Sequence, residues 1–170
     1  MSGKLIDQVH FAVGAYPVSI QNTGLDQSSY ALGEVVNVGK YGHVTIVLIG
    51  GAFAGTSAIT VRSATSAAGV SVSSDKVTIA HRYLCTGITA GSDTWVETDV
   101  SSSTWTWPAT ANLANVIEFD TASLEAGHEW VAVNAVAAGV GASLIAALYI
   151  LSEPRYISAE TAPTALTPIA

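Results

Sequence analysis

Charge is scarce in this sequence. Only 11% of its 170 residues are Asp, Glu, Lys or Arg, whereas hydrophobic residues make up 49%. A typical soluble domain is about 25% charged. An isolated chain of this composition would expose wide uncharged areas, and monomeric proteins rarely expose apolar patches above roughly a few hundred Å². The composition therefore predicts a subunit of a larger assembly, with much of its surface covered by neighbouring subunits.

Basic residues are the scarcer of the two charged kinds. The chain has six Lys and Arg against 13 Asp and Glu, which gives a net charge of −7. Binding to nucleic acid needs clusters of cationic side chains that neutralise phosphates. No such cluster is present, so we expect no nucleic-acid partner; the six stand singly, as Lys4, Lys40, Arg62, Lys76, Arg82 and Arg155.

Cysteine occurs once, as Cys85, which excludes an intrachain disulfide framework. It lies in the apolar run Tyr83-Leu84-Cys85, where a buried, unreactive thiol is the default interpretation. The first residues contain no secretory signal, because Asp7 interrupts any apolar stretch. We therefore expect the chain to fold in a reducing cytoplasm.

One uncharged segment, from Val131 to Leu151, is long enough to span a bilayer as a helix. Asn134, the break at Gly139-Val140-Gly141 and the alternation in Val131-Ala132-Val133 favour two strands joined by a glycine turn instead. We expect no membrane partner.

Strand-forming residues are abundant, with 19 Val, 17 Thr and 18 Ser, and helical periodicity is rare. Apolar and alternating runs separated by Gly- and Ser-rich turns predict an all-β fold, an antiparallel β-sandwich of jelly-roll-like type. His43–Ile49 is apolar on both faces, which predicts a central strand, and its spacing from Ala58–Arg62 predicts a hairpin. Further strands are expected within Lys76–Cys85, Thr94–Val100, Thr104–Pro108, Asn115–Asp120, Glu129–Val136 and Ser143–Leu151.

The chain divides into three parts. Residues 1–35 alternate only weakly and are expected to form an N-terminal arm or edge strands. Residues 36–156 are expected to form the β-sandwich domain. Residues 157–170 are rich in Pro, Thr and Ala, and Pro163 and Pro168 cannot donate ladder hydrogen bonds, so we expect an extended C-terminal tail that lies against a neighbour.

Catalytic and metal-binding patterns are missing from the sequence. The four histidines, His10, His43, His81 and His128, have no metal-ligand spacing. Glu97 with Asp99, and Glu118 with Asp120, would each point to one side of a strand, either as a Ca²⁺ or acid–base pair or as the solvent face of a sheet. The solvent face is the simpler explanation. We expect no catalytic residues, no metal, no cofactor and no enzymatic activity.

The aromatic residues are the most informative for binding. Trp105 and Trp107 share one face of a predicted strand, where two indoles would either stack on sugar rings or pack in a core or subunit interface. Trp is enriched among interface anchors, so packing is the favoured alternative. The predicted interface residues are Trp95, Trp105, Trp107, Phe53 and Tyr156.

Seven stretches of the chain carry a resemblance to known proteins. They are Lys40–Ile46, Gly51–Gly55, Ala58–Val61, Ala67–Gly69, Asp120–Leu124, Val131–Asn134 and Leu148–Tyr156. Taken in order, they resemble a loosely defined group of small virion proteins of tailed bacteriophages, of the head-decoration or minor structural kind. The middle of the chain, from 70 to 115, matches only in general character. The resemblance implies a β-rich virion protein without enzymatic activity, and it carries over no functional residue.

Together these observations predict a structural component of a phage virion, foremost a capsid decoration or cement protein on the shell surface. Its expected partners are the major capsid protein or other virion subunits, and further copies of itself in a homo-oligomer such as a trimer. A tail or head–tail connector component is the alternative within the same class. A carbohydrate-binding module using Trp105 and Trp107 is the alternative from another class.

Overall fold

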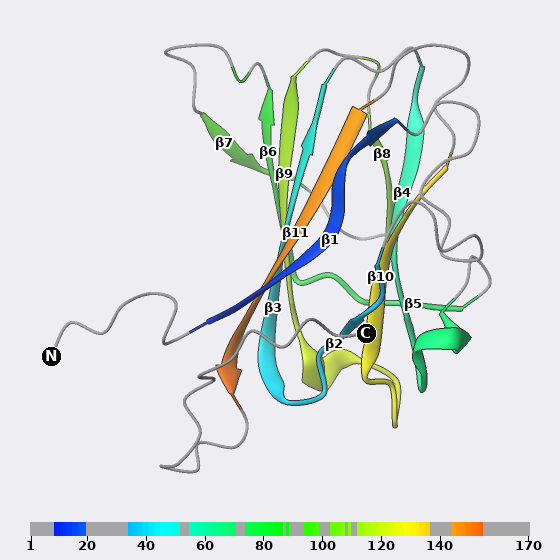
Figure 1. Ribbon diagram of the computed structural model, residues 1–170. Coiled ribbons are helices and arrows are strands. Elements are labelled where there is room, and N and C mark those ends of the chain that lie inside the picture. Colours follow the sequence, from blue (N-terminus) through cyan, green and yellow to red (C-terminus); the bar gives the residue numbers. More distant parts are fainter. Residues whose placement is uncertain are drawn as a thin grey trace, which may run out of the picture.

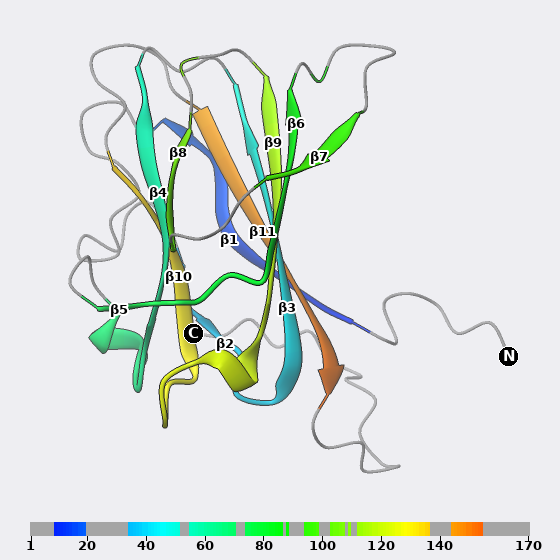
Figure 2. The same cartoon turned by 180° about the vertical axis from the view of Figure 1, so that it is seen from behind.

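The protein folds as a sandwich of two antiparallel β-sheets (Figures 1 and 2), which confirms the predicted all-β sandwich. The structure is a computed structural model that describes residues 9–19, 34–51, 55–70, 74–86, 88, 94–98, 103–107, 109, 112–136 and 144–154. Within these ranges the only helical segments are two 3-10 turns, η3 (Ala67–Gly69) and η4 (Thr121–Ser123). The predicted tail, 157–170, lies outside the described residues, as does most of the segment 1–35.

The first layer is a six-stranded sheet. Its strands follow, from one edge to the other, the order β1 (His10–Ser19), β11 (Leu144–Pro154), β3 (Tyr41–Gly50), β9 (Leu113–Asp120), β6 (His81–Thr86) and β7 (Trp95–Glu97). The second layer holds β2 (Val36–Asn37), β10 (Trp130–Ala135), β4 (Ser57–Ala64) and β5 (Asp75–Lys76), and β8 (Thr104–Trp107) also pairs with β4.

The strand β3 is central, as its sequence predicts. It pairs with β11 on one side and with β9 on the other. Val44, Ile46 and Leu48 alternate along it and are fully buried between the two sheets. Val47 and Ile49 therefore point to the opposite face, which has no second layer of described residues over it.

The core lies between the sheets and is built from the inward side of each strand. Its largest fully buried side chains include Trp107, Tyr149 and Phe119. Tyr149 also joins the layers directly, because its hydroxyl accepts a 2.8 Å hydrogen bond from the backbone N–H of Val133 in β10. Burial at roughly 25 cal/mol per Å² of apolar surface makes this packing the main source of stability.

The predicted hairpin of His43–Ile49 with Ala58–Arg62 is wrong. The two runs form β3 and β4, which lie in opposite sheets and take their partners from distant parts of the chain. The chain crosses from one layer to the other between them. In the same way, Lys76–Cys85 contributes β5 to one sheet and β6 to the other. The crossing after β3 looks like a hairpin turn in the sequence, because its glycines suit either connection. The crossing from β5 to β6 runs through residues 77–80, Val-Thr-Ile-Ala, which carry no turn signal and look like part of a strand.

Two further segments behave as strands. Residues 10–19 form β1, the edge strand beside β11, with shifts of register between Val13 and Ala15 and between Ala15 and Val18. The uncharged segment Val131–Leu151 divides into β10 and β11, which lie in different sheets. Within the described ranges, none of the helical turns has the length and apolar character needed to cross a bilayer.

Candidate interaction surface

The outward side of the six-stranded sheet, away from the core, is apolar over one half of its length. Strand pairing places Val13 of β1 opposite Leu148 of β11, Leu148 opposite Val47 of β3, and Val47 opposite Val116 of β9. In the next row Ile49 pairs with Ala146. Four neighbouring strands thus carry aliphatic side chains on their outward face. In a sheet whose outward face contacts only water, these positions would be polar.

These aliphatic side chains enclose a shallow groove. It has a volume of about 350 Å³ and crosses β1, β11 and β3. Val13 is 58% exposed and Ile49 is 53% exposed, and both belong to a contiguous group of aliphatic side chains, so they are not scattered single residues. We call this surface the outer apolar face and define it by Val13, Val47, Ile49, Ala146 and Leu148, all of which line the groove.

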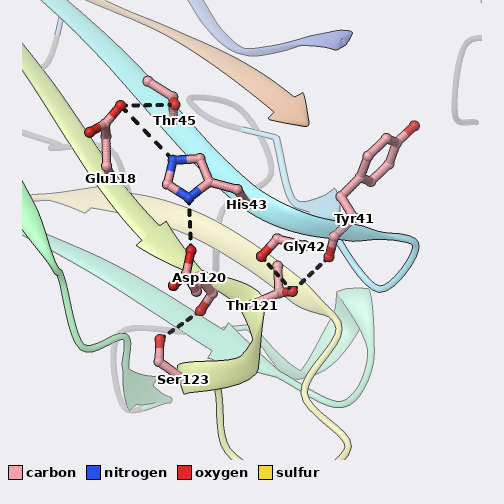
Figure 3. A network of polar contacts seen from close by, with 8 residues as sticks. All are labelled: Tyr41, Gly42, His43, Thr45, Glu118, Asp120, Thr121 and Ser123. Atoms are coloured by element: carbon pink, nitrogen blue, oxygen red, sulfur yellow. Dashed lines mark hydrogen bonds and ion pairs between the residues drawn. The ribbon is translucent and has the colours of Figure 1, made fainter. Parts of the chain in front are cut away.

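The other half of the same sheet face is polar. His43 lies between two carboxylates of the neighbouring strand β9 (Figure 3). Its Nδ1 is 2.8 Å from Oδ1 of Asp120, and its Nε2 is 3.9 Å from Oε1 of Glu118. Thr45, one row closer to the apolar half, donates a 3.4 Å hydrogen bond to the same oxygen of Glu118. Because the Asp120 carboxylate can only accept, the ring N–H of His43 is the donor.

A second histidine–carboxylate pair extends this polar region across the sheet. His81 of β6 pairs in register with Glu118, and its Nδ1 lies 2.8 Å from Oε1 of Glu97 in β7. Partial burial raises the pKa of the neighbouring Tyr83 hydroxyl, and the charges of Glu97 and Glu118 raise it further. We call this region the histidine–carboxylate band and define it by His43, His81, Glu97, Glu118 and Asp120.

The turn after β9 fixes the band at its lower end, as Figure 3 shows. The hydroxyl of Thr121 lies within hydrogen-bond distance of two backbone carbonyls of β3, 2.6 Å from Tyr41 O and 3.1 Å from Gly42 O. Ser123 donates a 2.7 Å hydrogen bond to the carbonyl of Asp120. These contacts hold the end of β9 against the start of β3, and they fix the backbone position of Asp120 beside His43.

No cation of the described part of the chain neutralises this band. Lys40 lies in the turn before β3, and Arg62 and Lys76 belong to the other sheet. Arg82 turns inward, where its guanidinium lies 5.6 Å from the ring centre of Trp105 and its Nη1 is 3.4 Å from Asn115 Oδ1. Burial lowers the pKa of Arg82 accordingly. The outward side of the six-stranded sheet is therefore apolar at one end and acidic at the other.

The described residues contain no group of three or more His, Cys, Asp or Glu side chains arranged to hold a metal ion. Asp99, which the sequence pairs with Glu97, lies outside the described residues. Glu118 and Asp120 do point to one side of β9, and their neighbours are the histidine and the threonine described above.

The chain is structurally similar to a prophage-derived protein. The crystal structure of SPBc2 prophage-derived protein YomS superposes with a TM-score of 0.42 and 14% sequence identity, over 84% of this chain and 92% of that chain. A likeness of this degree carries no argument about function. No protein-family model matches the sequence, and no curated protein matches it.

The predicted aromatic interface residues divide into three cases. Trp105 and Trp107 share one face of β8, as predicted, but that face is the inner one, and both indoles are buried in the core. The exposed platform that sugar stacking needs is absent from β8, which corrects the carbohydrate-binding alternative. Trp95 is 45% exposed on the outward face of the six-stranded sheet. Strand pairing places it in one row across the sheet with Cys85, Ala114 and Ile49. Phe53 and Tyr156 lie outside the described residues.

One constellation was not anticipated from the sequence. Ser63, His128 and Asp75 come together, with Ser63 Oγ 2.9 Å from His128 Nδ1 and Asp75 Oδ2 3.7 Å from His128 Nε2. These are the residue types of a hydrolase triad. However, Ser63 is only 1% exposed, so a substrate carbonyl has no access to its hydroxyl. The arrangement is best explained as a buried hydroxyl that satisfies its hydrogen-bonding capacity.

The outer apolar face was also missed, although the sequence carries its signal. The runs at 44–49 and 144–151 contain apolar residues at both odd and even positions. The sequence analysis predicted a strand at each run, central in the case of 43–49, without saying what covers the second apolar face. A strand in a two-layer sandwich has only one inner face, so the second apolar face had to be exposed or covered by another chain.

Proposed function

We propose that the protein is a non-enzymatic structural component of a phage particle, and specifically a decoration or cement protein on the capsid. The observation that carries the proposal is the outer apolar face, which gives a charge-poor chain a surface suited to burial against another subunit. The resemblance to tailed-phage virion proteins supports the choice of particle. The expected partners are the major capsid protein, other virion subunits and further copies of this chain.

Such a protein would act by adding contact area at the junctions between capsid subunits. Apolar burial contributes roughly 25 cal/mol per Å², from which association costs must be subtracted. A modest net gain at one site becomes large when it recurs at every equivalent site of a shell. Pressure from inside the particle would then have to break these contacts, in addition to those of the shell itself, before the shell opens.

Copy number per particle tests this function. Particles of the phage that encodes the chain would be purified, and the protein would be quantified by mass spectrometry against the major capsid protein. A decoration protein is expected in hundreds of copies. A dozen copies or fewer would favour the alternative of a tail or head–tail connector component, and absence from purified particles would contradict both.

Rebinding provides a second test. Particles produced without the gene would be mixed with the purified protein and examined by electron microscopy and by heating. We expect regular density on the shell and a higher temperature of particle disruption than for undecorated particles. A protein that stays unbound, and leaves that temperature unchanged, would contradict the cement function.

A further inference from the structure

We infer that the outer apolar face binds a different protein chain, one that brings apolar side chains to Val47 and Ile49 and places Lys or Arg side chains opposite the histidine–carboxylate band. The identity of the particle in which this partner occurs rests on the proposed function. The chemistry of the partner rests on the arrangement of the sheet face alone.

The apolar half of the face requires an apolar partner. Val13, Val47, Ile49 and Leu148 form a continuous patch over three adjacent strands, and the groove between them can receive a side chain. An apolar patch that is bordered by polar residues in this way often marks a binding site. The core beneath is complete without it, because Val44, Ile46 and Leu48 fill the inner side of β3.

The polar half decides between a second copy and a different chain. Glu97, Glu118 and Asp120 present carboxylates, and the ion pairs of these carboxylates among the described residues are with histidines alone. In a two-fold dimer each copy offers the same surface to the other. A dimer that buries the whole face would set each acidic half against either the other acidic half or the partner copy's apolar half. Both arrangements lack a counter-charge from the described Lys and Arg residues, and uncompensated charge in an interface is costly.

A different chain that carries Lys or Arg beside its apolar contact area would neutralise these carboxylates. We call that part of the partner its basic border. Asp120 and Glu97 remain largely exposed beside their histidines, so both carboxylates can accept further hydrogen bonds from Arg or Lys. Because the apolar and acidic halves occupy opposite ends of the strands, a partner with one apolar area and one basic border can dock in a single orientation. Charge pairing at the border then supplies specificity and the apolar half supplies adhesion.

Photo-cross-linking in cells that assemble particles tests the inference. The full chain would carry p-benzoylphenylalanine in place of Ile49, and the matched control would carry it in place of Val136, which is 55% exposed and follows β10 of the other sheet. We expect an adduct from position 49 with a different chain, mapped to a segment that contains Lys or Arg, and a far weaker adduct from position 136.

The adducts separate this inference from the proposed function. An adduct with a second copy, or with residues 1–8 or 155–170 of the same chain, would overturn the inference even if the protein is found in particles. The same holds if position 49 gives no adduct in particles that contain the protein. An adduct with a different, basic chain outside particles would support the inference and contradict the virion function. No adduct and no protein in particles would contradict both.

Charge variants test the basic border. Glu118→Gln and Asp120→Asn would be combined, and Glu125→Gln, an exposed carboxylate in the connection after η4, is the control. We expect the double variant to bind its partner about tenfold more weakly at low salt, and the difference to shrink at high salt, because paired interfacial charges are screened. Circular dichroism melting would show that both proteins are folded. Equal binding by the double variant and the control would contradict the basic border.

Discussion

At the scale of single residues, Tyr149 connects the two sheets through one hydrogen bond. Its hydroxyl accepts from the N–H of Val133, and β2 pairs with β10 only at Trp130 and Val131. Val133 lies beyond that pairing, and its N–H donates instead to the Tyr149 hydroxyl of the opposite sheet. A fully buried donor without a partner costs about 1–3 kcal/mol.

Tyr149→Phe is therefore expected to lower the free energy of unfolding by about 1–3 kcal/mol, since it removes the acceptor and leaves the N–H of Val133 buried. Urea unfolding followed by fluorescence measures the difference. The control is Tyr83→Phe, at a partly exposed tyrosine of β6, which should change the free energy of unfolding far less. Equal effects of the two changes would contradict the role of this bond.

The same side chain predicts a dependence on alkaline pH. Burial raises the pKa of the Tyr149 phenol, and the hydrogen bond from Val133 offsets only part of the effect. In the unfolded chain the phenol ionises near its ordinary pKa of about 10. Its contribution to stability is complete below that pH and is lost as pH rises towards the folded-state pKa, because only the unfolded state releases the proton.

Unfolding free energies measured from pH 8 to pH 11.5 should thus fall more steeply in the natural protein than in Tyr149→Phe. Burial also raises the pKa of Tyr41 and Tyr83, but both residues are present in the two proteins and cancel in the comparison. Parallel curves for the two proteins would show that Tyr149 ionises as readily in the folded state as in the unfolded one.

The tryptophans show what residue patterns can and cannot predict. Alternation correctly placed Trp105 and Trp107 on one side of a strand. It could not tell the inner side from the outer one, because threonines flank both indoles and threonine is tolerated on either face. Which side of β8 faces the core depends on where the other sheet lies. The position of β8 is set by its pairing with β4, which lies more than 40 residues earlier in the chain.

At the scale of elements, β1 is shaped by Gly14. A Cβ atom at this position would overlap the ring of Tyr149, so the strand can lie close to β11 only with glycine there. The register of β1 shifts between Val13 and Ala15, at this same point. The close approach to Tyr149 and the shift of register thus occur at the same residue.

Gly14→Ala is expected to loosen β1 and to destabilise the fold by about 1–3 kcal/mol, because overpacking forces the strand or the Tyr149 ring to move. Hydrogen exchange of β1 and β11 amides would report the loosening. Gly51→Ala is the matched control, since a Cβ there meets only Leu144 at an ordinary distance of 3.8 Å. Faster exchange in both variants would argue against a specific clash.

Strands were easier to predict than their partners. The expected strands at 43–49, 104–108, 115–120 and 143–151 correspond to β3, β8, β9 and β11, because each carries a local run of β-branched or alternating residues. The pairing of β3 with β11, about 100 residues apart, leaves no local trace. Nothing in the glycine-rich connection after β3 distinguishes a return within one sheet from a crossing to the other.

At the scale of the whole molecule, the outer apolar face and the net charge of −7 act against each other. Charge repulsion between copies keeps an exposed apolar surface from associating non-specifically. This protection disappears near the isoelectric point of about 4.8. The free protein should then become prone to association through the apolar face.

Light scattering between pH 4 and pH 8 should consequently show a maximum near pH 4.8 for the natural protein. The double change Val13→Thr and Ile49→Thr keeps the charge and the β-branched shape, and it should reduce this maximum strongly. Val136→Thr, away from the outer apolar face, should leave the maximum almost unchanged. A maximum that is equally high in all three proteins would show that association uses another surface.

The two edges of the six-stranded sheet have a consequence for how copies of the protein meet. At one edge β1 is irregular and contains Pro17, which has no N–H to offer, and at the other β7 is only three residues long. Neither edge is a good template for one more strand. Copies at high concentration are thereby kept from joining edge to edge into one continuous sheet, and contact between them is left to the faces of the sandwich.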